Sequence, residues 1–312
     1  MAAENRQKLL VVLGPTATGK TALAIRLAQQ LGGEIVSADS MQIYRGLDVG
    51  TAKATPAERA AVPHHLIDIC DPQQSFSVAD YVACAKEAVA GIAARGRLPI
   101  VAGGTGLYLS SLLDGLSFAA EPQDDGIRAR LAQEAEALGE QAMYDRLARL
   151  DPQSAAATHP HNRKRVLRAL ELYEKTGRTM SEQRAVSRPA QRPYDALLLG
   201  LDLPRPELYA RIDARVQAMM AAGLMEEARR VYAHRDSWKT AAQAIGYKEL
   251  FPAIEGSADE AACVEKLCQA TRNYAKRQLT WFRRMEGVQW LNAAAPQPEG
   301  AVQIFLHSAG SI

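Results

Sequence analysis

An eight-residue segment near the start of the chain has the residue types of a phosphate-binding loop. Residues 14–21 read GPTATGKT and match the pattern G-x-x-x-x-G-K-[ST] at every position. In such a loop, backbone N–H groups surround anionic oxygens, the lysine bridges phosphates and the final hydroxyl can ligate Mg²⁺. The sequence therefore predicts a diphosphate or nucleotide site, with Lys20 on the phosphates and Thr21 as metal ligand. The predicted binding residues are Gly14, Pro15, Thr16, Ala17, Thr18, Gly19, Lys20 and Thr21.

The segments on either side of this loop have the patterns that its function requires. An apolar run at Leu9–Leu13 predicts a buried strand before the loop. Thr21–Leu31 then has the pattern of an amphipathic helix that Gly32-Gly33 ends. A strand, a glycine-rich loop and a helix in this order present the helix N-terminus to a bound anion.

Asp39 follows the second predicted strand. In a doubly wound sheet, ligands bind beyond the carboxyl ends of the strands, so the Asp39 carboxylate is expected near the bound phosphates. Its functional interpretation is a general base. The alternative is a turn residue, or a group that supports Mg²⁺ indirectly.

The strand Leu98–Ala102 ends in Gly103-Gly104-Thr105-Gly106, where a nucleotide hydrolase usually has an acidic residue for Mg²⁺ and water activation. None is present. This absence weakens an ATPase interpretation and favours an enzyme that uses the loop to hold a leaving group. Gly103–Gly106 could equally be a tight turn between a strand and a helix.

Short apolar runs alternate with helical periodicity along the chain. This predicts an α/β fold, a phosphate-loop parallel sheet with helices on both faces, plus an all-helical insertion domain. From about Leu116 strand signals vanish, so we predict the insertion at residues 116–193 and the catalytic core at 1–115 and 194–312. The predicted strands are Lys8–Leu13, Glu34–Ala38, His65–Ile69, Leu98–Ala102 and Ala196–Leu203.

Three further helices are predicted in the core. Ser77–Arg95 reads as a covering helix, and Pro204 and Pro206 start another, with Arg211 and Arg215 one turn apart on its flank. The last long helix runs from about Asp259 to Arg284, and Ala293–Gly300 resembles a loop.

Composition and charge limit the function classes. No apolar stretch reaches the length of a membrane span, and the phosphate loop begins at residue 14, which leaves no space for a targeting peptide, so we expect a cytoplasmic protein. The four cysteines lack metal-site or disulfide spacing and are expected to be reduced packing residues. No coiled-coil pattern appears, so a monomer is expected.

The basic residues are concentrated in two segments although the net charge is only +2. Residues 161–192 contain nine Lys or Arg against three Glu, and residues 271–284 contain five Lys or Arg and no acid. A long polyanion is the natural partner for such patches, although solvated surface could explain either one alone. In Tyr274–Arg283 aromatic and cationic residues alternate, which suits unstacked bases and phosphates or, alternatively, a core helix with a basic face.

Seven segments in one order give the chain a resemblance to the tRNA dimethylallyltransferase (tRNA isopentenyltransferase) family. They are GPTATGKT at 14–21, SADSMQIYRGLDVGTAK at 37–53, PHHLID at 63–68, GGTGLYL at 103–109, RKRVLRALE at 163–171, AIGYKE at 244–249 and YAKRQLTWFR at 274–283. The resemblance covers roughly residues 8 to 290.

The resemblance implies transfer of a dimethylallyl group from dimethylallyl diphosphate to the exocyclic amine of the adenosine 3′ to the tRNA anticodon, with diphosphate released. It implies Mg²⁺ held through Thr21, Arg215 on the departing diphosphate beside Lys20, and Asp39 as the base. It also implies contacts with the tRNA anticodon stem-loop from Asp39, Ser40, Met41, Gln42, Thr105, Arg128, Lys164, Arg165, Val166, Leu167, Arg168, Gln243, Ala244, Ile245, Gly246, Tyr247, Lys248, Lys276, Arg277, Gln278, Leu279, Thr280, Trp281, Phe282 and Arg283.

Two rival functions share part of this pattern. A small-molecule or nucleotide kinase has the same loop, sheet and helical insertion, but it needs no aromatic and basic helix for RNA and would transfer the γ-phosphate of ATP. A non-catalytic RNA-binding protein gated by nucleotide predicts that Asp39→Ala leaves every activity unchanged.

Overall fold

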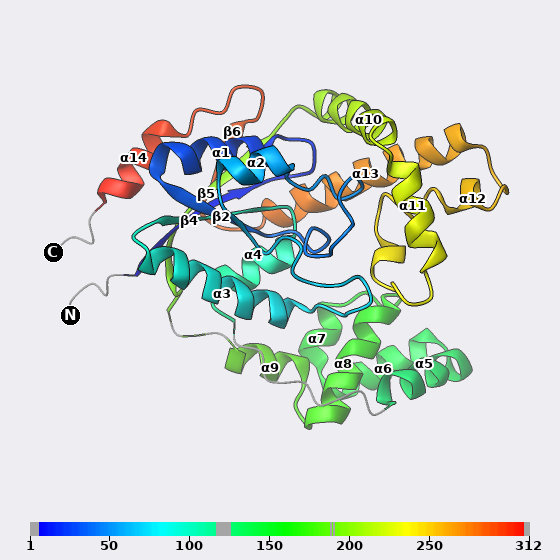
Figure 1. The fold of residues 1–312 in the computed structure, drawn as a ribbon. Coiled ribbons are helices and arrows are strands. Elements are labelled where there is room, and N and C mark those ends of the chain that lie inside the picture. The colour runs from blue at the N-terminus through cyan, green and yellow to red at the C-terminus, as the bar shows by residue number, and fades with distance from the viewer. Residues whose placement is uncertain (1–5, 117–125, 188, 190, 309–312) are drawn as a thin grey trace. The chain divides into compact units, whose positions relative to one another are not determined.

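The computed structural model describes residues 6–116, 126–187, 189 and 191–308. The chain separates into two compact units, one formed by residues 1–113 and 192–312 and the other by residues 114–191. We call them the core unit and the helical unit, and describe each by itself (Figure 1).

A parallel sheet organises the core unit. Its strands lie in the order β3-β2-β4-β1-β5-β6, and each described pair of neighbours is parallel. This confirms the predicted α/β fold with a parallel sheet. The strands are β1 (Gln7–Leu13), β2 (Gly33–Ser37), β3 (His64–His65), β4 (Leu98–Gly103), β5 (Tyr194–Asp202) and β6 (Val288–Asn292).

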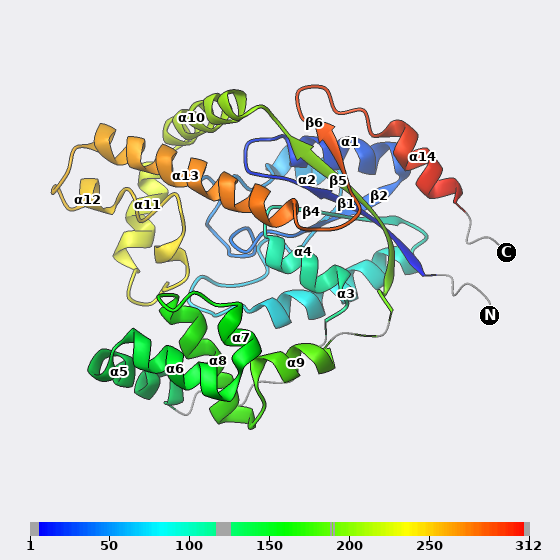
Figure 2. The same ribbon diagram turned by 180° about the vertical axis from the view of Figure 1, so that it is seen from behind.

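The central strand β1 is buried on both faces, which explains its continuous apolar run. Leu9 to Leu13 are each 0 % exposed. Leu10 and Val12 pack with helices α1, α10 and α14, while alternate residues of the same strand pack with α3 and α4 on the other face. Figures 1 and 2 show these layers on either side of the sheet. The helices are α1 (Lys20–Leu31), α2 (Pro56–Ala61), α3 (Val78–Ala94), α4 (Gly106–Leu113), α10 (Arg205–Ala221) and α14 (Glu299–His307).

The helix ends follow the sequence signals. Gly32, at φ 62°, ends α1 in the left-handed conformation that glycine tolerates best. The Ser77 side chain accepts a hydrogen bond from the Asp80 N–H, and the Asp80 carboxylate accepts one from the Ser77 N–H. This reciprocal pair is a capping box at the start of α3. The predicted helices over residues 21–31 and 77–95 are therefore confirmed to within one or two residues.

A third apolar cluster lies mainly in the part of the core unit between β5 and β6, and Ile43, Tyr44, Leu47 and Cys70 also belong to it. Leu224 and Tyr247 are 0 % exposed in it, and Leu267 is 2 % exposed. The elements that contribute are α10, α11 (Leu224–Ala233), the 3₁₀ turn η1 (Ala241–Gln243), α12 (Phe251–Ile254) and α13 (Glu260–Phe282). Because the N-terminal half of α13 packs here, the helix is fixed along much of its length.

The helical unit packs five described helices around its own core. Leu131, Leu147 and Leu170 are each at most 2 % exposed in that core. Every secondary-structure element described in this unit is a helix, as its Ala, Glu and Arg content predicts. They are α5 (Ile127–Leu138), α6 (Glu140–Leu150), α7 (Pro152–Ala156), α8 (Arg163–Thr176) and α9 (Met180–Ser187).

One prediction of local structure is wrong, and two short elements were not predicted. The strand expected over His65–Ile69 is reduced to His64–His65, because Leu66 and Asp68 have φ values of 61° and 57° and leave the extended region. The segment after α13 contains the edge strand β6 and, from Glu299, the helix α14, neither of which was expected. Both elements are short, and β6 is half exposed, so its apolar pattern is weak.

Candidate active site

The phosphate loop connects β1 to α1 by a backbone path that depends on glycine. Gly14 has φ 144°, and a Cβ there would lie 2.6 Å from the Leu201 carbonyl oxygen. Gly19 is left-handed at φ 82°, and Ala17 takes φ 65° although it is not glycine. The buried Thr18 hydroxyl donates to the Pro15 carbonyl oxygen at 2.8 Å, a hydrogen bond within the loop that stabilises its conformation.

Lys20 begins α1 and turns its ammonium back toward the loop. Nζ donates to the Pro15 carbonyl oxygen at 2.7 Å. Burial, reinforced by the positive charge of Arg215 and partly offset by Asp39, lowers the pKa of Lys20 to about 7. An anion bound on the loop would stabilise the charged form of Lys20, so the site favours anion binding.

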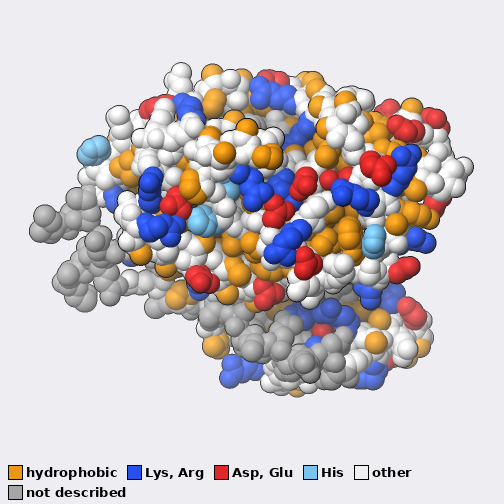
Figure 3. Space-filling model, viewed as in Figure 1, with side chains coloured by type: hydrophobic (Ala, Val, Ile, Leu, Met, Phe, Trp, Pro, Cys, Tyr) orange, Lys and Arg blue, Asp and Glu red, His pale blue; other side chains and the backbone are white. Residues whose placement is uncertain are grey.

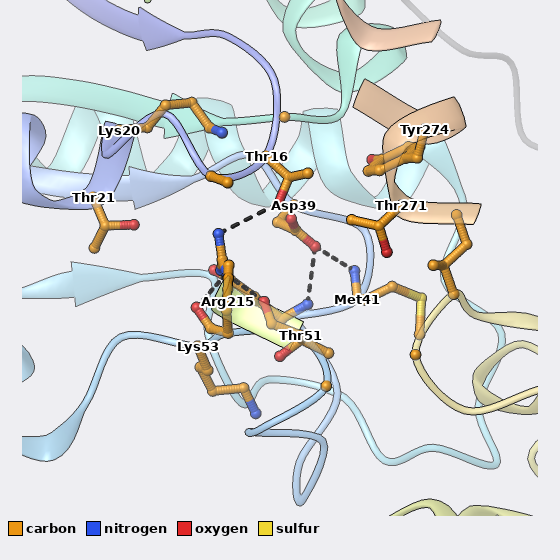
Figure 4. A pocket seen from close by; sticks show the side chains of 18 of the residues that line it. Thr16, Lys20, Thr21, Asp39, Met41, Thr51, Lys53, Arg215, Thr271 and Tyr274 are labelled. Atoms are coloured by element: carbon orange, nitrogen blue, oxygen red, sulfur yellow. Dashed lines mark hydrogen bonds between the residues drawn. The ribbon is translucent and has the colours of Figure 1, made fainter. Parts of the chain in front are cut away.

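Asp39 lies just beyond the carboxyl end of β2. Its Oδ1 accepts the backbone N–H groups of Met41 at 2.8 Å and Gln42 at 3.3 Å. Its Oδ2 has no hydrogen-bond partner among the residues that the structure describes. One oxygen thus has the turn-forming role that was the alternative interpretation, while the second oxygen is available to a ligand (Figure 4).

The two arginines on α10 have different partners. Arg211 pairs with Glu207 on the same helix at 2.9 Å. Arg215 donates to the Thr16 hydroxyl of the phosphate loop at 3.3 Å. Burial lowers the pKa of Arg215, and the negative charge of Asp39 offsets part of this effect. The guanidinium is therefore directed at the anion cradle rather than at solvent.

A cavity of about 500 Å³ joins these groups. Its polar wall includes Lys20, Thr21, Asp39 and Arg215, as well as side chains from Thr271 and Tyr274 on α13 (Figure 4). Helices α10 and α13 contribute one apolar wall of this lining. The residues of this wall are Ile212, Val216, Met219 and Leu267, and Met41 and Ile245 line the cavity elsewhere.

Two glycines at the end of β4 allow close approach of the segment after β2 and of α13. A Cβ on Gly103 would lie 2.2 Å from the Ala38 carbonyl oxygen, and one on Gly104 would lie 2.3 Å from Gln278 Nε2. Gln278 donates to the Gly104 carbonyl and accepts the Thr16 N–H, each at 2.9 Å. The tight-turn interpretation of residues 103–106 therefore has direct structural support, and Gln278 links α13 to the loop.

Glu227 is a buried carboxylate that the sequence analysis missed. It is 3 % exposed and accepts the backbone N–H groups of residues 48 to 50 at 2.8–3.0 Å, together with the Tyr247 hydroxyl at 2.8 Å. Gly50 packs so closely on the Tyr247 ring that a Cβ would lie 2.6 Å from it. These contacts join the segments around residues 50 and 246 that line the cavity, and a lone Glu in a helix gives no sequence signal for them.

The residues expected to contact tRNA in the core unit fall into three groups. Those on the cavity are Asp39, Ser40, Met41, Gln42, Ala244, Ile245, Gly246 and Gln278. Exposed side chains elsewhere belong to Gln243, Lys248, Lys276, Arg277, Thr280, Trp281 and Arg283. Thr105 and Leu279 are partly buried. Tyr247 and Phe282 are 0 % exposed, so their side chains pack in the core and do not face RNA.

The helical unit contains the remaining predicted contacts, at the start of α8 and at Arg128. Lys164 and Arg165 are exposed, whereas Val166 is 1 % exposed in the core of the unit and Leu167 packs against it. Arg128 and Arg168 pair with the buried Glu171 at 2.9 and 3.1 Å. Although burial opposes it, hydrogen bonds from Arg128, Lys175 and Arg168 lower the pKa of Glu171. Arg168 and Lys175 of the basic segment 161–192 thus neutralise Glu171 of the same unit.

Other classes of site are not evident in the described residues. Among them there is no group of three or more His, Cys, Asp or Glu arranged to hold a metal ion. No described helix combines the length and apolar character needed to cross a bilayer. On the face drawn in Figure 3, Lys and Arg side chains of the core unit lie among Asp and Glu rather than in one continuous patch.

Comparisons with known proteins agree on one family. The model of the IPP transferase family matches residues 42–285. A tRNA dimethylallyltransferase of Roseiflexus sp. (strain RS-1) is 51 % identical over 288 residues, which are 92 % of this chain and 93 % of the relative. The solved tRNA isopentenylpyrophosphate transferase of Bacillus halodurans has a TM-score of 0.70 and 41 % identity and covers 98 % of this chain and 96 % of its own. A eukaryotic dimethylallyltransferase solved acting on tRNA has a TM-score of 0.79 at 29 % identity, over 96 % of this chain and 79 % of its own.

Proposed function

This chain belongs to the IPP transferase family and transfers a dimethylallyl group to tRNA, and from that premise we propose how its cavity does so. The acceptor is the exocyclic amine of the adenosine immediately 3′ to the anticodon, and the donor is dimethylallyl diphosphate. The observation that carries this proposal is a single cavity lined by a phosphate loop, a partly buried arginine, a carboxylate with one available oxygen and an apolar wall.

The donor's diphosphate binds on residues 14–21, with Lys20 and Arg215 on its oxygens. Backbone N–H groups and the N-terminus of α1 add preorganised positive potential. Negative charge grows on the diphosphate as its bond to carbon breaks, so these groups stabilise the transition state more than the ground state. The dimethylallyl tail contacts the apolar wall formed by Ile212, Val216, Met219 and Leu267.

Asp39 acts as the base. The exocyclic amine of adenine donates its lone pair into the ring and is a weak nucleophile, so removal of its proton during attack on the first allylic carbon speeds the reaction. Asp39 Oδ2 is the oxygen that accepts this proton, while Oδ1 keeps its bonds to Met41 and Gln42. A carboxylate in this role contributes about 10² to 10⁴ in rate.

The donor set of the cavity fits Mg²⁺. Mg²⁺ keeps several waters and takes one or two protein oxygens together with substrate phosphates. The Thr21 hydroxyl and the Asp39 carboxylate are oxygen groups on this cavity, and Thr21 is the residue we propose as the direct ligand. When bound, the ion neutralises charge on the departing diphosphate.

The anticodon stem-loop is the part of tRNA that we propose the chain grips. Adenine stacked inside a loop is out of reach, so it must leave its stack at a cost of a few kcal/mol, which contacts elsewhere offset. The exposed Lys164 and Arg165 on α8 and the exposed Lys276, Arg277 and Trp281 on α13 are suited to that grip. We also propose that the enzyme acts as a monomer in the cytoplasm, where tRNA is found.

A labelled-donor assay tests the proposed reaction. Unmodified tRNA, Mg²⁺ and radiolabelled dimethylallyl diphosphate should yield labelled RNA, and nuclease mapping should place the label 3′ to the anticodon. A tRNA carrying inosine at that position, which lacks the amine, is the control and should stay unlabelled. Equal labelling of both RNAs would reject the proposed acceptor, and transfer of γ-phosphate from ATP would support a kinase instead.

A further inference from the structure

A second cavity, of about 680 Å³, lies at the same edge of the sheet and shares no lining residue with the first. Asp202 at the end of β5 and Asn292 at the end of β6 line it. In parallel α/β sheets, ligands bind beyond the carboxyl ends of strands. This cavity therefore has the position of a ligand site, although the proposed reaction does not use it.

Helix α13 borders both cavities with opposite faces. Successive helical residues are about 100° apart, so Tyr274 and Gln278 share one face and Lys276 and Arg283 share the other. The first pair lines the phosphate cavity and the second pair lines the second cavity. Arg277 is exposed on the helix surface between them. A strand of RNA that crosses α13 would thus pass from one cavity to the other.

The lining has an aromatic surface beside cations. Trp290 is 38 % exposed. The Arg205 guanidinium lies 5.3 Å from the centre of the Tyr209 ring, and its Nε donates to the Tyr209 hydroxyl at 2.8 Å, so this arginine contacts the ring. Lys276 is exposed and has no ion-pair partner in the described part of the chain. Asp202 pairs with Arg283 at 3.1 Å, which leaves Arg205 and Lys276 as the unneutralised cations of the cavity.

We propose that the second cavity binds one unstacked nucleotide of the substrate tRNA. The base stacks on the Trp290 indole, and its phosphate binds Lys276 and Arg205. Unstacked bases on aromatic rings with cations at the backbone are the usual chemistry of single-stranded RNA recognition. The proposal rests on tRNA as the substrate but not on the base or the acceptor atom proposed above.

Tryptophan fluorescence reports on the cavity directly. The chain has three tryptophans, so Trp238→Phe with Trp281→Phe leaves Trp290 as the sole emitter. Saturating tRNA should quench this emission, whereas AMP at the same nucleotide concentration should leave it unchanged. Emission that tRNA does not alter, or that AMP quenches equally, would overturn the proposal; the second result would indicate a site for free nucleotides.

Two substitutions test the same cavity by kinetics. Lys276→Ala and Trp290→Leu should each raise the KM for tRNA about fivefold or more, with kcat and the KM for dimethylallyl diphosphate unchanged. Trp290 packs on Gly200, so Trp290→Leu could destabilise the fold. Lys276 is exposed, so Lys276→Ala is expected to fold and keeps the test decisive. The matched controls are Arg97→Ala, which precedes β4 at the opposite edge of the sheet, and Ile304→Ala on α14.

The kinetic and fluorescence results fail in ways that can be told apart. If the KM for tRNA in Lys276→Ala equals that of Arg97→Ala, the second cavity takes no part in RNA binding. If the labelled-donor assay fails while tRNA still quenches Trp290, the proposed acceptor is wrong and this site stands.

Discussion

Lys20 is the residue where burial and charge conflict most directly. Its pKa of about 7 in the folded chain lies below the ordinary value of 10.5. Its charged form therefore costs stability in full below pH 7, and this cost fades as the pH rises toward 10.5. A bound anion reverses the balance because it favours the ammonium. Binding of the donor is thus coupled to uptake of a proton.

This coupling can be measured by calorimetry. At about pH 8.5, dimethylallyl diphosphate is fully ionised, and its binding should take up close to one proton, because binding raises the pKa of Lys20 from about 7. Titrations in two buffers with different ionisation enthalpies give the number of protons. Well below pH 7 the uptake should vanish.

Lys20→Arg is the matched control for the calorimetric test. It keeps a cation on the loop but stays protonated at every pH used, so its binding should take up no proton. Equal uptake by both proteins would contradict the role given to Lys20.

At the scale of elements, the walls of the cavity depend on buried polar groups that join distant segments. Gln278 connects α13 to both the phosphate loop and the turn after β4. Glu227 connects α11 to residues 48–50 and to Tyr247. Each group satisfies donors that no other described side chain reaches. Movement of α13 or α11 would therefore change the shape of the cavity.

Glu227→Ala should destabilise the core unit. It leaves three partly buried backbone N–H groups and the buried Tyr247 hydroxyl without the Glu227 carboxylate as acceptor, at a cost of about 3 kcal/mol or more in the free energy of unfolding. Urea denaturation measures this change. Glu226→Ala is the control on the same helix, because Glu226 is 71 % exposed and pairs only with Arg229 among the described residues. A difference between the two variants below about 1 kcal/mol would contradict the bridging role.

The sequence was sufficient for most of the fold, for identifiable reasons. Buried parallel strands have continuous apolar runs, and α1 and α3 have clear end signals, so their positions could be predicted. The edge strand β6 and the loop after His65 could not be predicted. β6 is half exposed, and the loop depends on left-handed residues at Leu66 and Asp68.

The candidate site was predictable only in part. The phosphate loop is a local motif, and Asp39 directly follows a strand, so both could be assigned to one edge of the sheet. Glu227 and the dual contacts of Gln278 depend on packing between segments more than 170 residues apart, which no local pattern encodes. The second cavity likewise arises from β5, β6, α10 and α13 together.

For the whole molecule, the distribution of charge decides how RNA binding depends on salt. A net charge of +2 gives little general attraction for RNA. Specific unpaired cations must supply it. In the helical unit, Arg128 and Arg168 are held by Glu171, whereas Lys164 and Arg165 are exposed with no ion pair in the part that the structure describes.

Arg165→Ala should weaken tRNA binding and flatten its salt dependence. Loss of one phosphate contact lowers the slope of log K against log salt by about 0.7 to 0.9. Filter binding over a range of salt concentrations measures the slope. Arg130→Ala is the control from the same unit, because Arg130 is engaged by Glu134 and Glu174. Slopes that match between the two variants would exclude Arg165 from the interface.

The central claim is that Asp39 removes a proton from an amine held against a cradled diphosphate. Asp39→Asn tests it most directly, because an asparagine oxygen can still accept the Met41 and Gln42 N–H groups and keep the turn. Single-turnover prenyl transfer should fall by at least about a hundredfold, with the affinities for tRNA and dimethylallyl diphosphate within about twofold of the unaltered protein. Transfer at the unaltered rate, or a loss explained wholly by weaker binding, would contradict the claim.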